Sequence, residues 1–138
     1  MSNSVSPNLK EYARRLLAYE ASSGNPGDAQ NPTVFRVCEK LRGPMGKLTG
    51  VRGFRSLLSR ALALAGAEVP WLRGLHVQAD GSLEGLAGLE GDLDRSAIVL
   101  GETVLVAHLL GLLVIFIGPV LTQGLLRDIW PKMEYMNL

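Results

Sequence analysis

The longest uncharged stretch of this chain runs from residue 103 to residue 126 and contains no Asp, Glu, Lys or Arg. Within it, 13 of the 19 residues from 103 to 121 are Val, Leu, Ile or Phe. A helix of this composition belongs either at the centre of a helical bundle or in a lipid bilayer. Roughly 17–25 apolar residues suffice to cross a membrane, so the length of the stretch permits both.

Four features of the sequence favour the bundle. Gly118-Pro119 divides the stretch and leaves about 15 residues before it, or about 22 Å of helix against about 30 Å of hydrocarbon. His108 lies inside the stretch and would need a polar partner in lipid, and Glu102 lies directly before it. The preceding amphipathic segments also need an apolar surface to pack against. We therefore expect a buried central helix over residues 95–117, with a membrane anchor through residues 103–126 as the alternative.

Apolar residues at helical spacing predict further helices over residues 7–23, 32–42, 51–65 and 120–130. Gly43-Pro44 is expected to stop or kink the second of them. Glycines at 43, 46, 50 and 53 predict a broken helix or loop before Val51, because glycine in a helix interior costs about 1 kcal/mol relative to alanine. Asp92 or Asp94 can cap the long helix.

Alternating residues on both sides of Asp80-Gly81 indicate a small β-hairpin near residues 72–86. The predicted fold class is thus all-α. We expect a bundle of four or five helices around a buried apolar helix, with this hairpin as a small insertion. The length of 138 residues suits a single domain over residues 1–138, with residues 1–5 and 132–138 as flexible tails.

Charge is distributed unevenly along the chain. Residues 1–60 carry a net charge of +6 and residues 61–138 a net charge of −5, which leaves +1 for the whole chain. A basic surface on the second and third helices is therefore a candidate binding site for an anionic partner: Arg36, Lys40, Arg52, Arg55 and Arg60. The alternative, which we favour, is an ordinary solvated face offset by the acidic half. Nucleic acid is not an expected partner, because no motif of a nucleic-acid-binding fold is present.

Catalytic and metal-binding patterns are absent from the sequence. The string GPMGKLTG resembles a phosphate-binding loop, but Leu48 stands where that motif requires Ser or Thr. Cys38 lies among apolar residues and is expected to be a buried hydrophobe. Glu102 and His108 are the candidate buried polar residues. We predict no catalytic residues, no cofactor and no metal site.

The function expected from these features is that of a non-enzymatic protein-interaction or self-association module. One alternative is a protein that is tail-anchored in a membrane through residues 103–126, facing the cytoplasm. A second is a helical protein that binds a small molecule in a pocket near His108. Because the N-terminal residues lack a secretory signal and the chain has one cysteine, the expected location is the cytoplasm.

Overall fold

The computed structural model describes residues 6–23, 32–85 and 93–133, and it is 81% helical. The elements, in chain order, are α1 (Pro7–Ser23), α2 (Thr33–Glu68), a short 3-10 helix η2 (Pro70–Gly74), β1 (His76–Val77), β2 (Leu83–Glu84), α3 (Arg95–Ile117) and α4 (Pro119–Ile129). The predicted fold class, an all-α bundle with a small hairpin, is confirmed. Residues 1–5 and 134–138 of the expected tails lie outside the described residues, whereas Met133 is buried.

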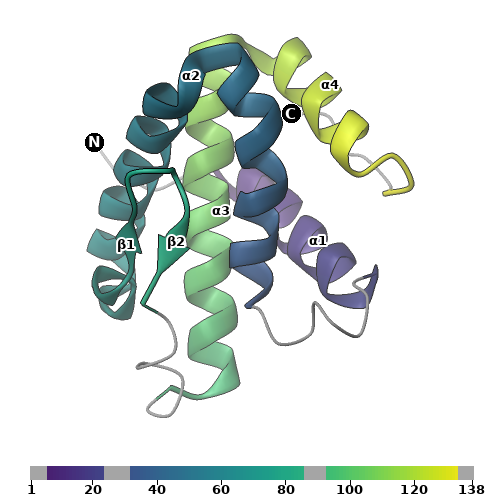
Figure 1. Ribbon diagram of the computed structural model, residues 1–138. Coiled ribbons are helices and arrows are strands. Elements are labelled where there is room, and N and C mark those ends of the chain that lie inside the picture. Colours follow the sequence, from purple (N-terminus) through teal and green to yellow (C-terminus); the bar gives the residue numbers. More distant parts are fainter. Residues whose placement is uncertain (1–5, 24–31, 86–92, 134–138) are drawn as a thin grey trace.

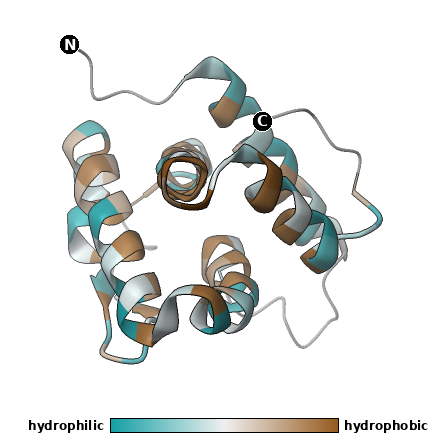
Figure 2. Cartoon of the chain, turned by 90° about the horizontal axis from the view of Figure 1, so that it is seen from above, coloured by the Kyte–Doolittle hydropathy of each residue, from teal (hydrophilic) through white to brown (hydrophobic). Residues whose placement is uncertain are grey.

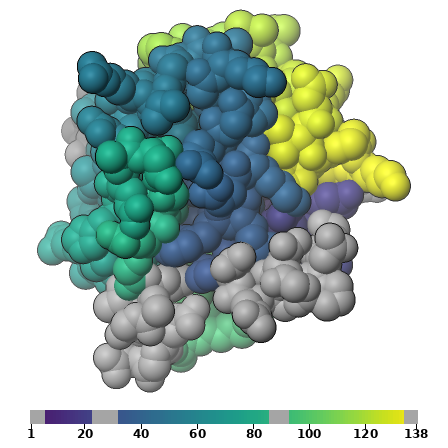
Figure 3. Space-filling model, in the orientation of Figure 1, coloured from purple at the N-terminus to yellow at the C-terminus, as the bar shows by residue number. Residues whose placement is uncertain are grey.

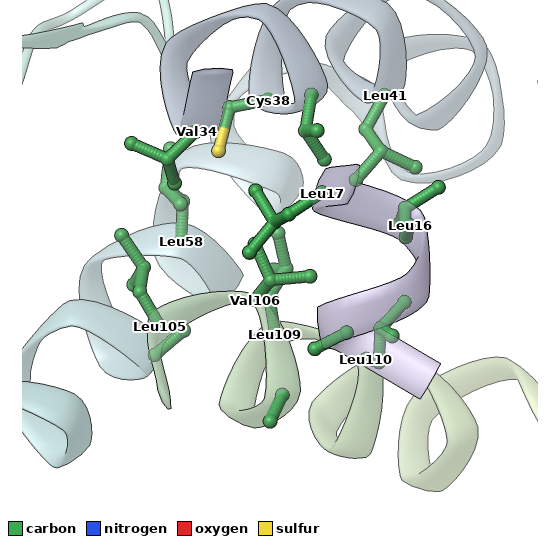
Figure 4. Packing of buried hydrophobic residues seen from close by; sticks show 14 of the residues in the cluster. Leu16, Leu17, Val34, Cys38, Leu41, Leu58, Leu105, Val106, Leu109 and Leu110 are labelled. Atoms are coloured by element: carbon green, nitrogen blue, oxygen red, sulfur yellow. The ribbon is translucent and has the colours of Figure 1, made fainter. Parts of the chain in front are cut away.

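Helix α3 forms the centre of the bundle. Figure 1 shows it between the two halves of α2, with α1 behind it and α4 along one outer side. Residues 101–110 of α3 are all buried. Figure 4 shows side chains from α1 and from both halves of α2 packed around α3. Burial of such side chains, at about 25 cal/mol per Å² of apolar surface, is the main stabilising term.

The sequence predicted that Gly43-Pro44 would stop or kink α2; the helix does not end there, so the predicted stop was wrong. Pro44 lies within α2, and the chain bends instead at Gly50. Leu41 and Met45, one helical turn apart on either side of Pro44, are both fully buried. Their burial offsets the roughly 3 kcal/mol that proline costs in a helix interior. The sequence predicted a broken helix or loop between residues 42 and 51. Within this segment only Gly50 has non-helical backbone angles.

Two glycines with nearly the same backbone conformation make the sharp bends of the molecule. Gly50 has φ 77° and ψ 162°, and Gly118, between α3 and α4, has φ 87° and ψ 161°. This region of backbone space is open almost only to glycine. Figure 1 shows both bends at the upper end of the bundle.

Replacing Gly50 with alanine is expected to lower the free energy of unfolding by about 1–3 kcal/mol, the cost of holding a side chain in this backbone region. Gly46→Ala is the matched control, because an added Cβ meets nothing within 4 Å at either glycine. Gly46 is helical, so its replacement should stabilise the protein by about 0.5–1 kcal/mol. Urea denaturation followed by circular dichroism measures both values. Equal effects of the two substitutions would contradict the bend at Gly50.

The segment after α2 is held against the helices by a few specific contacts. Strands β1 and β2 pair antiparallel, with Val77 opposite Leu83. The backbone N–H and hydroxyl of Ser82 donate to the Asp80 carboxylate at 2.9 and 2.6 Å, and these bonds hold the pKa of Asp80 below its usual value. Trp71 of η2 donates to the backbone carbonyl of Ala97 in α3 at 2.9 Å. A two-stranded hairpin is marginal alone, so packing on the helices stabilises it.

Candidate functional site

Three polar contacts inside the bundle account for most of its buried charged residues. In the first, buried His108 at the middle of α3 bonds through Nε2 to the carboxylate of Glu68, the last residue of α2. Lys10 of α1 lies 3.8 Å from the other oxygen of that carboxylate. The contact joins three helices. No hydroxyl or thiol nucleophile is bonded to His108 in the described part of the chain, so the arrangement has the form of a structural link rather than a catalytic set.

In the second contact, Glu102 of α3 accepts a hydrogen bond from the backbone N–H of Val34 at 3.0 Å. Val34 lies in the first turn of α2, where backbone N–H groups lack helical partners and the helix dipole is positive. A buried carboxylate from another helix therefore caps α2. Asp94 caps α3 itself by accepting from the backbone N–H of Ala97 at 2.8 Å, and Asp92 lies outside the described residues. Glu102 and His108 thus contact different partners and do not form one site.

The third contact surrounds Glu20 of α1, whose side chain is 1% exposed. Its carboxylate lies 2.7 Å from Nζ of Lys40 and accepts from the indole N–H of Trp130, just beyond α4, at 2.9 Å. Arg36 donates to the backbone carbonyl of Glu20, and its Nε lies 3.6 Å from the carboxylate. The sequence analysis did not identify Glu20. Its partners lie 16–110 positions away in sequence, and no local pattern links them.

The five residues of the candidate basic surface therefore have two different environments. Arg36 and Lys40 belong to the Glu20 contact, and the Arg36 side chain is 10% exposed. Arg52, Arg55 and Arg60 are exposed, and within the described ranges none of them forms an ion pair. Lys47, which lies before the bend of α2, is exposed and equally unpaired among those residues.

The described part of the chain offers little support for cysteine chemistry or for metal binding. Burial raises the pKa of Cys38 to about 12, and the charge of Glu39 adds to the effect. The thiol is thus protonated at neutral pH and enclosed, so it is a poor nucleophile and a poor metal ligand. Among residues 6–23, 32–85 and 93–133, no group of three His, Cys, Asp or Glu side chains is placed to hold a metal ion.

A shallow cavity of about 200 Å³ lies between α1 and α3. Arg14, Arg95, Glu102 and Thr103 contribute to its lining, and His108 does not. Of these groups, Arg14 is already paired with Glu11 at 2.7 Å and Glu102 bonds the start of α2. The cavity has few polar groups left to orient a small molecule.

The largest unexplained surface feature is a group of exposed apolar side chains at the two bends. We call this group the apolar end, and its members are Leu48, Val51, Ile115, Phe116, Val120 and Leu121. Their exposed fractions range from 53% to 83%. The first two flank Gly50 and the other four flank Gly118. Figure 2 looks down on this end and shows apolar residues at the end of α3 and the start of α4. Figure 3 shows the bend of α2 at the top of the molecule, with the α3–α4 corner behind it at the same end.

The bend at Gly118 explains why these residues remain in water. Helix α4 places Thr122, Leu125 and Leu126 inward, so Val120 and Leu121 lie outside. The last turn of α3 extends past the packed part of the bundle and exposes Ile115 and Phe116. The sequence analysis divided residues 103–126 at Gly118-Pro119, but it did not predict that the apolar side chains on both sides of this bend would be exposed. The sequence signal that could have identified the exposed residues was the presence of apolar pairs beside a glycine at which the chain bends.

Within the described ranges, α3 alone is long and apolar enough to cross a membrane by length and composition, and 61% of its most apolar window is buried inside the protein. Core helices of soluble proteins have the same property. Comparison with protein-family models, with curated proteins and with solved structures finds no match.

Proposed function

We propose that this protein is a non-enzymatic docking module that binds the surface of a lipid bilayer through its apolar end. The observation that carries the proposal is that six of the eight large apolar side chains exposed within the described residues lie at one end of the bundle. Groups of exposed apolar side chains mark interaction or membrane sites. Its members project from two convex helix corners, a shape suited to shallow insertion between lipid head groups.

Self-association through the same surface is the closest competitor. A symmetric dimer places the same surface patch of both copies against each other. Lys47 and Arg52 of one copy would then lie near the basic residues of the other, and apposed like charges cost several kcal/mol. This repulsion favours a bilayer over a second copy.

A membrane-spanning α3 would require the bundle to open. Residues 101–110 of α3 pack against the buried faces of α1 and α2, and those faces would lose their cover. Peripheral binding uses only side chains that are already in water, so it leaves the core intact. We therefore favour a peripheral protein over a tail-anchored one.

Flotation with phosphatidylcholine–phosphatidylglycerol vesicles tests the proposal. The wild-type protein is expected to float with the vesicles and to be released by a carbonate wash. Ile115→Ser/Phe116→Ser should weaken binding by at least about tenfold, because burying one such side chain contributes about 1.5–3 kcal/mol. Val99→Ser/Leu100→Ser is the matched control, since these two exposed apolar residues lie toward the opposite end of the same helix.

Three results would contradict the proposal. A wild-type protein that floats with no vesicle has no membrane function of this kind. Equal losses for the two double variants would mean that binding does not depend on the apolar end. A dimer in light scattering that Ile115→Ser/Phe116→Ser converts to a monomer, without vesicle binding, would assign this surface to self-association.

A further inference from the structure

The charged residues nearest the apolar end along the chain are all basic. Between residues 40 and 67 the sequence has six Lys or Arg and no Asp or Glu, and residues 103–127 contain no acidic residue. Both bends fall within these two ranges. The charged residues of the chain segments that flank the two bends are thus all positive, although the whole chain has a net charge of only +1. Asp80 of the hairpin approaches α2 at Arg42, with which it pairs at 3.4 Å.

Among the described residues, the basic side chains at the bend of α2 also lack acidic partners, unlike many others. Six lie within 4 Å of a carboxylate: Lys10, Arg14, Arg15, Arg36, Lys40 and Arg42. Lys47, Arg52 and Arg55 are exposed and have no ion pair among the described residues. Their charges are available to an external anion.

Resting on the proposed function, we infer that the bilayer recognised by the apolar end is an anionic one, and that Lys47, Arg52 and Arg55 bind its head-group phosphates. Lys47 directly precedes Leu48, and Arg52 directly follows Val51. When these apolar side chains enter the interface, the long basic side chains beside them reach back to the level of the phosphates. Each basic residue near such a surface strengthens binding by about 1 kcal/mol, or about fivefold.

A bilayer can bind both the apolar and the basic residues of this surface, whereas other polyanions can bind only the basic ones. A nucleic acid would neutralise the basic residues but leave Ile115, Phe116 and Val120 in water. The same holds for free phosphate. An anionic bilayer offers phosphate groups and apolar chains within a few ångströms of each other.

The inference also gives the protein an orientation on the membrane. Helix α3 runs along the bundle, and its C-terminal turn lies at the apolar end (Figure 1). The bundle would thus stand on the bilayer with α3 pointing toward it, and only the last turn of this helix would enter the interface.

Vesicle binding of charge variants tests the lipid assignment. The wild-type protein should bind phosphatidylcholine–phosphatidylglycerol vesicles at least about tenfold more tightly than pure phosphatidylcholine vesicles at low salt, and salt should reduce the difference. Lys47→Gln/Arg52→Gln should lose about 25-fold on the anionic vesicles and little on the neutral ones. Arg95→Gln/Lys132→Gln is the matched control: it removes the same charge from exposed residues outside this surface and should change binding less than about twofold.

The outcomes separate this inference from the function on which it rests. Equal binding to neutral and anionic vesicles that still depends on Ile115 and Phe116 would overturn the anionic preference and leave the docking function standing. Binding to neither vesicle would overturn both. Binding to a DNA oligonucleotide that survives Ile115→Ser/Phe116→Ser would assign the basic residues to a nucleic acid instead of a lipid.

Discussion

Leu110→Asp is expected to abolish the cooperative unfolding transition of this protein. Leu110 is 0% exposed and belongs to the packed cluster shown in Figure 4. The substitution removes a buried apolar side chain and places a carboxylate among apolar neighbours, which costs more than about 5 kcal/mol. A domain of this size is stable by only about 5–15 kcal/mol in total. Thermal melting followed by circular dichroism measures the effect.

The control for this experiment lies on the same helix. Leu100 is 57% exposed, so Leu100→Asp should change the free energy of unfolding by no more than about 0.5 kcal/mol. If Leu110→Asp melted like the wild-type protein, α3 would not be the core of the bundle, and a membrane-spanning role for this helix would become the better interpretation.

Glu20→Gln is expected to have the second-largest effect, a loss of about 3 kcal/mol in the free energy of unfolding. The substitution preserves shape and removes the charge that faces Arg36 and Lys40. Lys40 is 45% exposed and can turn to water, but Arg36 is 10% exposed and would remain a buried cation without its anion. Removing one partner of a buried ion pair costs about 3–5 kcal/mol. Urea denaturation of both proteins gives the difference.

Glu11→Gln serves as the comparison, because Glu11 also contacts two arginines, Arg14 and Arg15, but its side chain is 39% exposed. Surface pairs of this kind contribute about 1 kcal/mol or less. A loss for Glu20→Gln no larger than that for Glu11→Gln would mean that the Glu20 contact does not fasten α1, α2 and α4 together.

The sequence contained enough information for the architecture, because a few strong signals decide it. The uncharged segment from residue 103 to residue 126 predicted the central helix, and Gly118-Pro119 predicted its end. The predicted stop at Pro44 was wrong because the low helix propensity of proline was considered without the packing of the helix. The burial of Leu41 and Met45 cannot be known before α2 is placed against its neighbours.

Much less of the candidate site than of the fold could be predicted from the sequence. Hydropathy described Ile115 and Leu110 as equivalent, although one is 82% exposed and the other is fully buried. Their difference arises from where α4 turns away, which depends on the whole bundle. The Glu20 contact was equally hidden, since Trp130 lies 110 positions from Glu20. The sequence analysis treated the basic residues as one group, and the structure separates those that face Glu20 from those that face solvent.

The cap that Glu102 provides to α2 has a consequence for how the chain folds. The hydrogen bond joins residues 68 positions apart, so the N-terminal turn of α2 gains its acceptor only after α3 has reached the first half of α2. Closing a loop of this length carries an entropic cost that must be met before the contact forms. We therefore expect the first turn of α2 to gain this cap only after the two halves of the chain have come together.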